Sequence, residues 1–334
     1  MVMGDMQSPR ETFILKRGAY DAPSEHRVTA RTPQILPAMQ EDAPRNRLGL
    51  AQWMFSPQNP LTARVTVNRY WQLLFGTGLV STPEDFGAQG EFPTHPELLD
   101  WLAVDFQQHG WDIKRTLKQM VMSQTYRQTS HATVADFERD PRNRQLARAA
   151  RFRLQGEFIR DGVLSMSGLL NTTQGGPGVK PYQPAGLWAE VGLGGNPKFV
   201  QDHGEKLYRR SLYTYWKRSA PPPSMQIFDA PTREKCTIRR ARTNTPLQAL
   251  VVLNDPQFVE AARHFAERVL SKPDASSVER LTEAFRIATS RFPSESELRT
   301  LLSVLQTMRD QFAQSPQDAS ELLGVGETSN DTQL

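Results

Sequence analysis

The sequence predicts a mainly α-helical, bundle-like protein with a small N-terminal β element and a long ordered loop region. Capping residues and apolar residues at helical spacing recur between residues 47 and 126 and again after residue 245. In residues 171–244, proline, glycine and aromatic residues replace that spacing. We expect four segments: 1–46, β and extended; 47–170, the helical core; 171–244, a basic aromatic loop region; and 245–334, the C-terminal helices.

The N-terminal segment carries the signs of one strand and one turn. Thr12 to Leu15 is typical of a strand, and Arg17-Gly18 of a turn. Several prolines between residues 23 and 44 predict extended or looped chain. Asn46 is placed to cap a short helix that Pro57 ends.

A first helix of the core is predicted after Asn59-Pro60. Asn59 supplies a cap, Pro60 fits the first helical position, and Gly76 closes the helix. A second helix is predicted from Thr94, which forms a capping box with Glu97.

That second helix continues with apolar residues at Leu98, Leu102 and Phe106 and stops at Gly110. Asp112 then caps a third helix that runs towards residue 126. Three amphipathic helices with short connections predict one packed unit.

Further helices are predicted on both sides of the loop region. Asp140-Pro141 begins a short arginine-rich helix ending near residue 150, and a longer helix covers residues 154–170. After the loops, two helices meet at Asn254-Asp255, a third covers residues 278–290, and a capping box of Ser294 and Glu297 begins a fourth.

Three strings of this sequence carry a resemblance to a known family. They are residues 71–111, KPYQPAGLW at 180–188, and the stretch 209–255 beginning RRSLYTYWKRS. They resemble the C-terminal planctomycete surface domain of type one, a domain of unknown function in large secreted planctomycete proteins. The resemblance covers nearly the whole chain as one family domain, and it transfers no catalytic residue.

The resemblance also implies a setting. Members usually stand behind a signal peptide, and many follow a domain similar to a c-type cytochrome. A periplasmic, cell-surface or extracellular location and a cytochrome-like domain of the same protein are therefore expected. The sequence starts without a signal peptide and ends, in GVGETSNDTQL, where relatives continue, so we expect a fragment of a longer protein.

Composition limits the classes of protein and of cofactor. The chain has 334 residues, 38% hydrophobic and 23% charged, which is typical of a globular protein without a membrane span. Cys236 is the only cysteine, so an intrachain disulfide and a CxxCH haem attachment are excluded. No cofactor is expected in this chain, and any haem would lie on another domain. Cys236 is expected to be a small, partly buried residue.

Two groups of residues, one of them containing a histidine, are the candidates for catalysis, and the sequence leaves enzymatic activity undecided. Asp85, beside Glu84, and His95 have acid and base chemistry, although Asp85 also suits a turn that bonds its own backbone. Glu157 and Asp161 share one helix face, where pairing with Arg153 and Arg160 is the alternative to catalysis or cation binding.

Other motif interpretations fail. The DFG at residues 85–87 lacks the remaining kinase motifs, and no metal site is predicted.

The strongest functional signal is an uneven distribution of charge. Residues 206–242 hold ten Lys or Arg against two acids, about +8, whereas the whole chain is +4. Guanidinium groups between Tyr and Trp suit a sulfated polysaccharide, because arginine binds sulfate and aromatic faces stack on sugar rings. The candidate ligand-binding residues are Trp216, Lys217, Arg218, Arg233, Arg239, Arg240 and Arg242.

Alternatives to this acidic-polysaccharide hypothesis stay open. These arginines can instead bond the loop region internally, in a structural domain without a ligand. The basic surface can also dock a cytochrome-like domain, as a redox scaffold. Nucleic acid is disfavoured because no standard nucleic-acid-binding motif is present.

Overall fold

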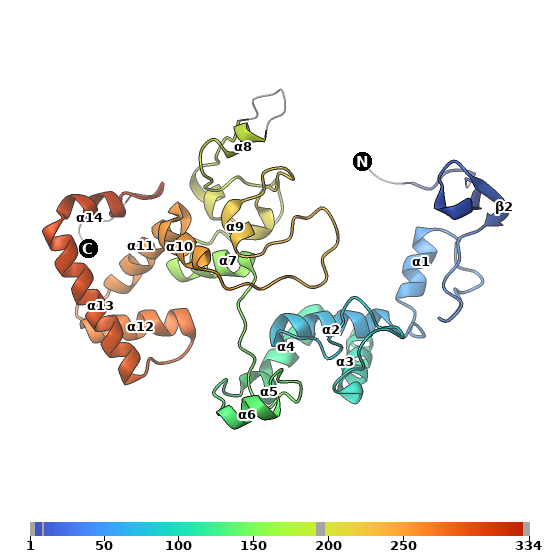
Figure 1. Ribbon diagram of the computed structural model, residues 1–334, viewed down its shortest axis with the longest axis horizontal. Coiled ribbons are helices and arrows are strands. Elements are labelled where there is room, and N and C mark those ends of the chain that lie inside the picture. Colours follow the sequence, from blue (N-terminus) through green and yellow to red (C-terminus); the bar gives the residue numbers. More distant parts are fainter. Residues whose placement is uncertain (1–3, 9, 192–197, 330–334) are drawn as a thin grey trace. The chain divides into compact units, whose positions relative to one another are not determined.

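The computed structural model of the protein describes residues 4–8, 10–191 and 198–329 (Figure 1). The described chain is mainly α-helical, as predicted, with one two-stranded sheet near the N-terminus. It divides between Phe152 and Arg153 into two compact units. That division falls within the segment 47–170 that the sequence indicated as one helical core.

The small sheet lies where the sequence placed it. Strand β1 (Thr12–Leu15) pairs antiparallel with β2 (Pro23–Val28), and Thr12 lies opposite Val28. A short 3-10 turn, η1 (Lys16–Gly18), joins them, with Arg17 at a positive φ of 52°. The second strand lies in a stretch for which the sequence predicted only extended chain.

Six helices follow in the first unit. They are α1 (Arg47–Met54), α2 (Thr62–Phe75), α3 (Pro96–Gln108), α4 (Ile113–Met122), α5 (Gln124–Arg127) and α6 (Val134–Arg139). The apolar faces of α2, α3 and α4 meet in a core that includes Val67, Trp71, Leu102, Phe106 and Met120. Burial of these side chains is the main stabilising contribution in this unit.

Predicted caps are confirmed at three helix ends. Asn46 accepts hydrogen bonds from the N–H groups of Leu48 and Gly49. Asp112 accepts one from the N–H of Arg115, and Gly76 ends α2 with a positive φ of 84°.

Two predicted helix starts are wrong in detail. Asn59 does accept hydrogen bonds from Leu61 N and Thr62 N, at 3.0 and 3.2 Å, but α2 begins at Thr62 rather than at Pro60. Thr94 does not cap α3, because its N–H donates to Leu79 O at 2.9 Å and its hydroxyl contacts His95 Nδ1 at 3.0 Å. His95 takes the N-cap position without a side-chain cap.

The arginine-rich helix predicted after Asp140-Pro141 is absent. Residues 140–150 form turns instead, in which Asp140 accepts from Arg144 N and Gln145 N at 2.9 and 2.8 Å. Arg148 donates to the carbonyls of Asp140 and Pro141. These side-chain bonds give the backbone an alternative to helix formation.

The second unit contains six helices of eight residues or more. They are α7 (Gly156–Ser167), α10 (Pro246–Asn254), α11 (Pro256–Leu270), α12 (Ser277–Thr289), α13 (Glu295–Gln314) and α14 (Pro316–Leu323). Helix α7 packs against α11, and α12 against α13 (Figure 1). The predicted capping box of Ser294 and Glu297 begins α13, and an unpredicted one of Ser276 and Glu279 begins α12.

The loop region between α7 and α10 is ordered, as predicted, by its own buried side chains. Its described residues contain only short elements, α8 (Leu187–Glu190), η2 (Gly204–Tyr208), η3 (Ser211–Tyr213) and α9 (Pro223–Ile227). Its buried residues include Trp188, Leu207, Tyr208, Met225 and Phe228. Residues 192–197 of the region lie outside the described residues.

A buried arginine ties these loops to the helices. Arg160 of α7 donates to Gln257 Oε1 at 2.8 Å and to the carbonyl oxygens of Leu207 and Arg209 at 2.7 and 2.8 Å. Burial lowers the pKa of Arg160 to about 10, against the opposite effect of Asp161 and Asp255, so the side chain stays charged at neutral pH. The loop carbonyls are thereby satisfied inside the unit.

Candidate functional site

Four of the predicted ligand-binding residues lie together where residues 215–220 run beside residues 231–235. Trp216 Nε1 donates to Thr232 O at 3.1 Å. Arg218 Nε donates to Glu234 Oε1 at 2.7 Å, and the Arg233 guanidinium lies 4.4 Å from the centre of the Trp216 ring. These contacts join two loop segments into one surface. We call it the basic aromatic patch, and it consists of Trp216, Lys217, Arg218, Arg233 and Lys235.

The local sequence explains why the chain turns here. The N–H of Ala220 donates to Lys217 O at 3.1 Å, which closes a turn, and Ala220 is buried. Three prolines follow at 221–223 and stop the chain from continuing as a regular strand. Arg233 has a positive φ of 63°, which turns the second segment back towards Trp216.

Lys217 connects the patch to a second group of aromatic side chains. Its Nζ lies 4.3 Å from the centre of the buried Trp188 ring. Lys180 Nζ lies 5.7 Å from the same ring and 5.5 Å from the ring of Tyr215. Cations at these distances are attracted to the ring faces. Tyr215 is 47% exposed, so part of its surface is available to a ligand.

The patch has one acidic partner, Glu234. The hydrogen bond and charge of Glu234 raise the pKa of Arg218. Their side chains are 81% and 47% exposed, so solvent screens this pair. Lys217, Arg233 and Lys235 make no ion pair with a carboxylate in the ranges that the structure describes. Three cations of the patch are thus not neutralised locally.

The remaining predicted arginines do not belong to the patch. Arg240 pairs with Glu157 of α7, with 2.7 Å between Nη1 and Oε2. Arg239 and Arg242 are exposed and each already engages other groups. Loss of water contact, and then the charge of Arg153, lowers the pKa of Arg242.

An anchor that the sequence analysis missed holds the end of this loop. Asp229, at a positive φ of 59°, forms an ion pair with Arg153 and accepts a hydrogen bond from Thr243 N at 2.7 Å. Arg153 Nε also donates to Thr243 O at 2.9 Å. Burial alone raises the pKa of Asp229, but the bonds from Thr243 and the charge of Arg153 outweigh it and lower the pKa. The partners are too far apart in the sequence for spacing to indicate the contact.

The first pair of catalytic candidates makes separate contacts. Asp85 Oδ1 accepts from Gly87 N at 2.7 Å, which is the turn that the sequence offered as the alternative. His95 Nδ1 contacts Thr94 Oγ1 at 3.0 Å. A cleft of about 290 Å³ lies between Arg64, Asp100 and residues 86–93, and neither candidate lines it. The geometry gives these two residues no shared site.

The second pair is used in structural contacts. Glu157 and Asp161 share a face of α7, but Glu157 pairs with Arg240 rather than with Arg153 or Arg160. Asp161 accepts from Ser211 N and Oγ at 2.7 and 2.6 Å, and lies 3.7 Å from Arg160. In the described chain, no group of three His, Cys, Asp or Glu side chains is placed to hold a metal ion.

Cys236 differs from its prediction, because it is exposed rather than partly buried. It lies in the segment 231–239, most of which is exposed. A small side chain in a charged stretch is no sign of burial when no apolar residues surround it.

Comparisons with known proteins give one result. The model of the PSD1 family, described as protein of unknown function (DUF1553), matches residues 46–305. No curated protein and no solved structure matches the chain. None of the helices within the described ranges has the length and apolar character needed to cross a membrane.

Proposed function

We propose that this chain, which belongs to the PSD1 family of proteins of unknown function (DUF1553), binds an acidic polysaccharide through the basic aromatic patch. The ligand class is a sulfated glycan. The proposed setting is a secreted or cell-surface multidomain protein of a planctomycete, in which a cytochrome-like domain accompanies this one.

The observation that carries the proposal is that Lys217 and Arg233 lie over the rings of Trp188 and Trp216, with Lys235 two residues after Arg233 on the same exposed loop. Within the described residues, none of these three cations forms an ion pair with a carboxylate. A guanidinium offers a fork of N–H donors that matches the oxygens of a sulfate group. Tyr215 adds an exposed ring on which a sugar ring can stack. Charge and stacking at one place fit a chain of sulfated sugars better than an isolated anion.

Structural arginines reduce the charge available to a ligand. Arg209 is buried and donates to the carbonyls of Thr173, Gly175 and Pro177. Arg240 is paired with Glu157. The excess of about +8 in residues 206–242 therefore overstates the patch, and we assign the anion contacts to Lys217, Arg233 and Lys235.

The test compares ligands and variants on the purified chain. Dextran sulfate and neutral dextran are titrated at 50 and 200 mM salt, conditions that separate charge-driven from neutral binding. We expect only dextran sulfate to bind, and its affinity to fall with salt, because each phosphate-type contact releases about one counterion. Equal binding of both dextrans would overturn the proposal.

Two double variants distinguish binding by the basic aromatic patch from attraction by the net charge of the chain. Arg233→Gln/Lys235→Gln is expected to weaken dextran sulfate binding at least about tenfold at 50 mM salt and to reduce the salt slope by about two. The control is Lys114→Gln/Lys118→Gln, which removes the same charge from exposed positions on α4. Equal losses in both variants would mean that net charge alone attracts the polymer.

Two further arms address the other hypotheses. Duplex DNA that binds as tightly as dextran sulfate would widen the ligand class to polyanions in general. No binding to dextran sulfate, together with binding to an acidic c-type cytochrome, would replace the polysaccharide proposal with the docking alternative.

A further inference from the structure

Glu260 of α11 is completely buried, and five hydrogen bonds satisfy its carboxylate. Tyr208 Oη and Tyr182 Oη donate to it at 2.9 and 3.1 Å. The backbone N–H groups of Glu327 and Thr328 donate at 2.9 Å each, and Thr328 Oγ1 at 2.8 Å. Three of the five donors therefore come from one short segment that follows the last helix. We call this segment, residues 326–329, the terminal segment.

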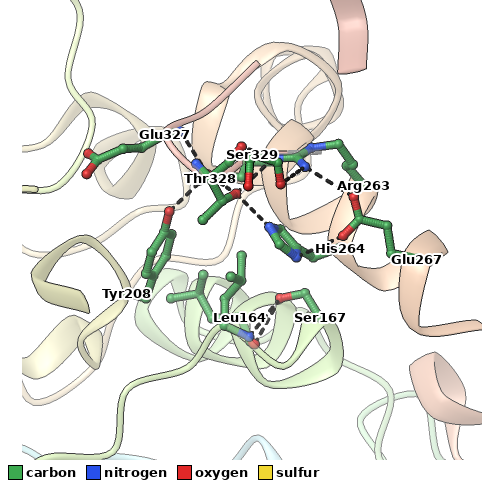
Figure 2. A network of polar contacts seen from close by, with 11 residues as sticks. Leu164, Ser167, Tyr208, Arg263, His264, Glu267, Glu327, Thr328 and Ser329 are labelled. Carbon is green, nitrogen blue, oxygen red and sulfur yellow. Dashed lines mark hydrogen bonds and ion pairs between the residues drawn. The ribbon is translucent and has the colours of Figure 1, made fainter. Parts of the chain in front are cut away.

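Two neighbouring side chains of α11 hold the same segment by its carbonyls and its hydroxyl. Figure 2 shows Arg263 and His264 directed towards Thr328 and Ser329. Arg263 donates to Thr328 O at 2.7 Å and Ser329 O at 3.0 Å, and His264 Nε2 lies 2.6 Å from Thr328 Oγ1. Glu267 orients both, at 3.1 Å from Arg263 Nη1 and 3.1 Å from His264 Nδ1.

The remaining residues of the terminal segment are also recognised individually. Glu327 accepts from Gly204 N at 2.7 Å, and its other oxygen lies 2.9 Å from His203 Nδ1. Gly326 has a φ of +104°, and a Cβ at that position would lie 2.4 Å from Glu260 Cδ. Only glycine fits there. The contacts are thus specific for glycine, glutamate and threonine at three successive positions.

These contacts are those of peptide recognition rather than of an apolar segment packed into a core. Residues 326–329 form no helix or strand, and none of them is buried. Their attachment is polar, and it uses backbone N–H and C=O groups together with side chains that differ at each position. Specific peptide sites combine backbone bonding with side-chain readout in this way.

A catalytic interpretation of the same atoms is weaker. Thr328, His264 and Glu267 have the order and distances of a nucleophile, base and acid. However, the Thr328 hydroxyl also accepts from Arg263 at 2.8 Å and donates to Glu260. The N–H groups of Glu327 and Thr328, which would serve as an oxyanion hole, are bound to Glu260 as well.

We infer that Glu260, Arg263 and His264, with Tyr182 and Tyr208, form a binding site for an extended Gly-Glu-Thr peptide, which residues 326–328 of the same chain occupy. The same segment of a second copy is its ligand when the chain's own segment is displaced. The site shares no residue with the basic aromatic patch, so it does not depend on the proposed polysaccharide function.

Amide hydrogen exchange tests the occupied state in the full chain. We expect the N–H groups of Glu327 and Thr328 to exchange at least about tenfold more slowly than in a free peptide, because both are bonded to a buried carboxylate. Thr328→Val should remove this protection and Thr328→Ser should retain it. Exchange at the rate of a free peptide in the wild-type chain would overturn the inference.

Peptide binding tests the site itself. A blocked, fluorescent peptide with the sequence of residues 325–329 is titrated into the wild-type chain and into Gly326→Ala, whose own segment no longer fits. We expect at least about tenfold tighter binding to Gly326→Ala, because the wild-type segment competes at an effective concentration on the order of millimolar. A peptide with alanine in place of the glycine should bind to neither chain.

Two outcomes of the titration contradict the site. They are equal binding to both chains, and no binding to a Gly326→Ala chain that keeps its helical circular dichroism. If Gly326→Ala does not fold, Thr328→Val takes its place, because valine has nearly the shape of threonine and lacks the hydroxyl that contacts Glu260 and His264.

Discussion

Arg160 and Glu260 are both buried, and each stabilises a segment that lies outside the α-helices and strands. Arg160 donates to two loop carbonyls and to Gln257, while Glu260 accepts from two tyrosines and the terminal segment. Burying a charged side chain is tolerated only when its hydrogen-bond donors or acceptors have partners. Both residues meet that condition with partners far away in the sequence, so they join parts of the second unit that no continuous helix connects.

Replacing Arg160 should destabilise the second unit strongly. Arg160→Met keeps much of the side-chain volume but leaves the carbonyls of Leu207 and Arg209 and the oxygen of Gln257 without their donor. We expect a loss of about 3–5 kcal/mol in the free energy of unfolding, measured by urea denaturation. Arg309→Met on exposed α13 is the control and should stay within about 0.5 kcal/mol of wild type. Similar losses in both would show that Arg160 is not a structural centre.

Glu260 should make the stability of the protein depend on acid. Burial alone raises the pKa of Glu260, but the hydrogen bonds from Thr328, Tyr208 and Glu327 outweigh it and lower the pKa. A carboxyl group with a native pKa below its unfolded value of about 4.3 stabilises the fold above that pH. This stabilisation is lost as the pH falls through the native pKa.

The measurement is the free energy of unfolding from pH 7 to pH 3 in wild type and Glu260→Gln. The difference between the two should be largest near neutral pH and shrink below about pH 4. Glu297, whose pKa is lowered to about 2 by Arg291 and Ser294, titrates equally in both proteins and cancels. If the difference in the free energy of unfolding between the two proteins does not change with pH, Glu260 stabilises the fold through its shape and not through its charge.

Single residues were predictable from sequence to different degrees. The excess of Lys and Arg between aromatic residues singled out Trp216, Lys217, Arg218 and Arg233 as candidates for ligand binding, which stays a prediction, and the structure places Arg233 over the ring of Trp216. The same pattern did not separate them from Arg240, because the acid that pairs with it lies 83 positions away. Glu260 gave one usable sign, a charge between the apolar residues Phe258 and Ala261 on the buried face of α11. Its partners could only be found in three dimensions.

At the scale of helices, the capping signals matter most where burial is small. Neither α12 nor α13 contains a buried residue, although they pack together. Their ends carry complete capping boxes, in which a serine hydroxyl accepts from the third N–H and a glutamate accepts from the serine N–H. Each box satisfies two backbone donors that the helix itself leaves unbonded.

Removing one cap should have a measurable cost. Ser294→Ala removes the acceptor for Glu297 N, and we expect a loss of about 1 kcal/mol in the free energy of unfolding. Ser303→Ala makes the same chemical change in the middle of α13 and should be neutral or slightly stabilising, because alanine has the higher helix propensity. The free energies of unfolding of both variants are measured by urea denaturation. An Ser294→Ala protein as stable as Ser303→Ala would show that the start of α13 does not limit stability.

Prediction of the helices succeeded where local signals agreed and failed where side chains bonded elsewhere. Asn46, Asp112 and Ser294 cap the helices that they were expected to cap. The predicted cap at Thr94 was wrong because the backbone of Thr94 bonds to Leu79 instead. The helix predicted after Asp140 was wrong because the Asp140 carboxylate accepts hydrogen bonds within a turn. Helix α14 was not predicted at all, although Pro316 stands at its first position.

At the scale of the whole molecule, each unit has its own core. The cluster around Trp71 and Phe106 contains only residues before position 153, and the cluster around Leu164, Leu207 and Tyr208 only residues after it. The match to the PSD1 family extends over both units, from residue 46 to 305. Sequence periodicity could not indicate the division, because it does not tell which helices pack together.

Separate fragments should therefore locate the polysaccharide binding. Residues 1–152 hold 18 Lys or Arg and 16 acids, and residues 153–334 hold 22 and 20, so the two fragments have the same net charge of +2. If bulk charge attracted dextran sulfate, both fragments would bind alike. Because only the second contains the basic aromatic patch, we expect residues 153–334 to bind within about threefold of the full chain, and residues 1–152 at least about tenfold more weakly.

A thermal melt by circular dichroism comes first, because each fragment must unfold cooperatively for the comparison to apply. We expect one cooperative transition for each fragment, because each hydrophobic cluster lies entirely within its own fragment. Arg233→Gln/Lys235→Gln in the second fragment should then reduce dextran sulfate binding to the level of the first. The two fragments have the same net charge and differ in how that charge is distributed. Equal binding of dextran sulfate by two folded fragments would therefore mean that net charge attracts the polymer and that the basic aromatic patch does not bind it.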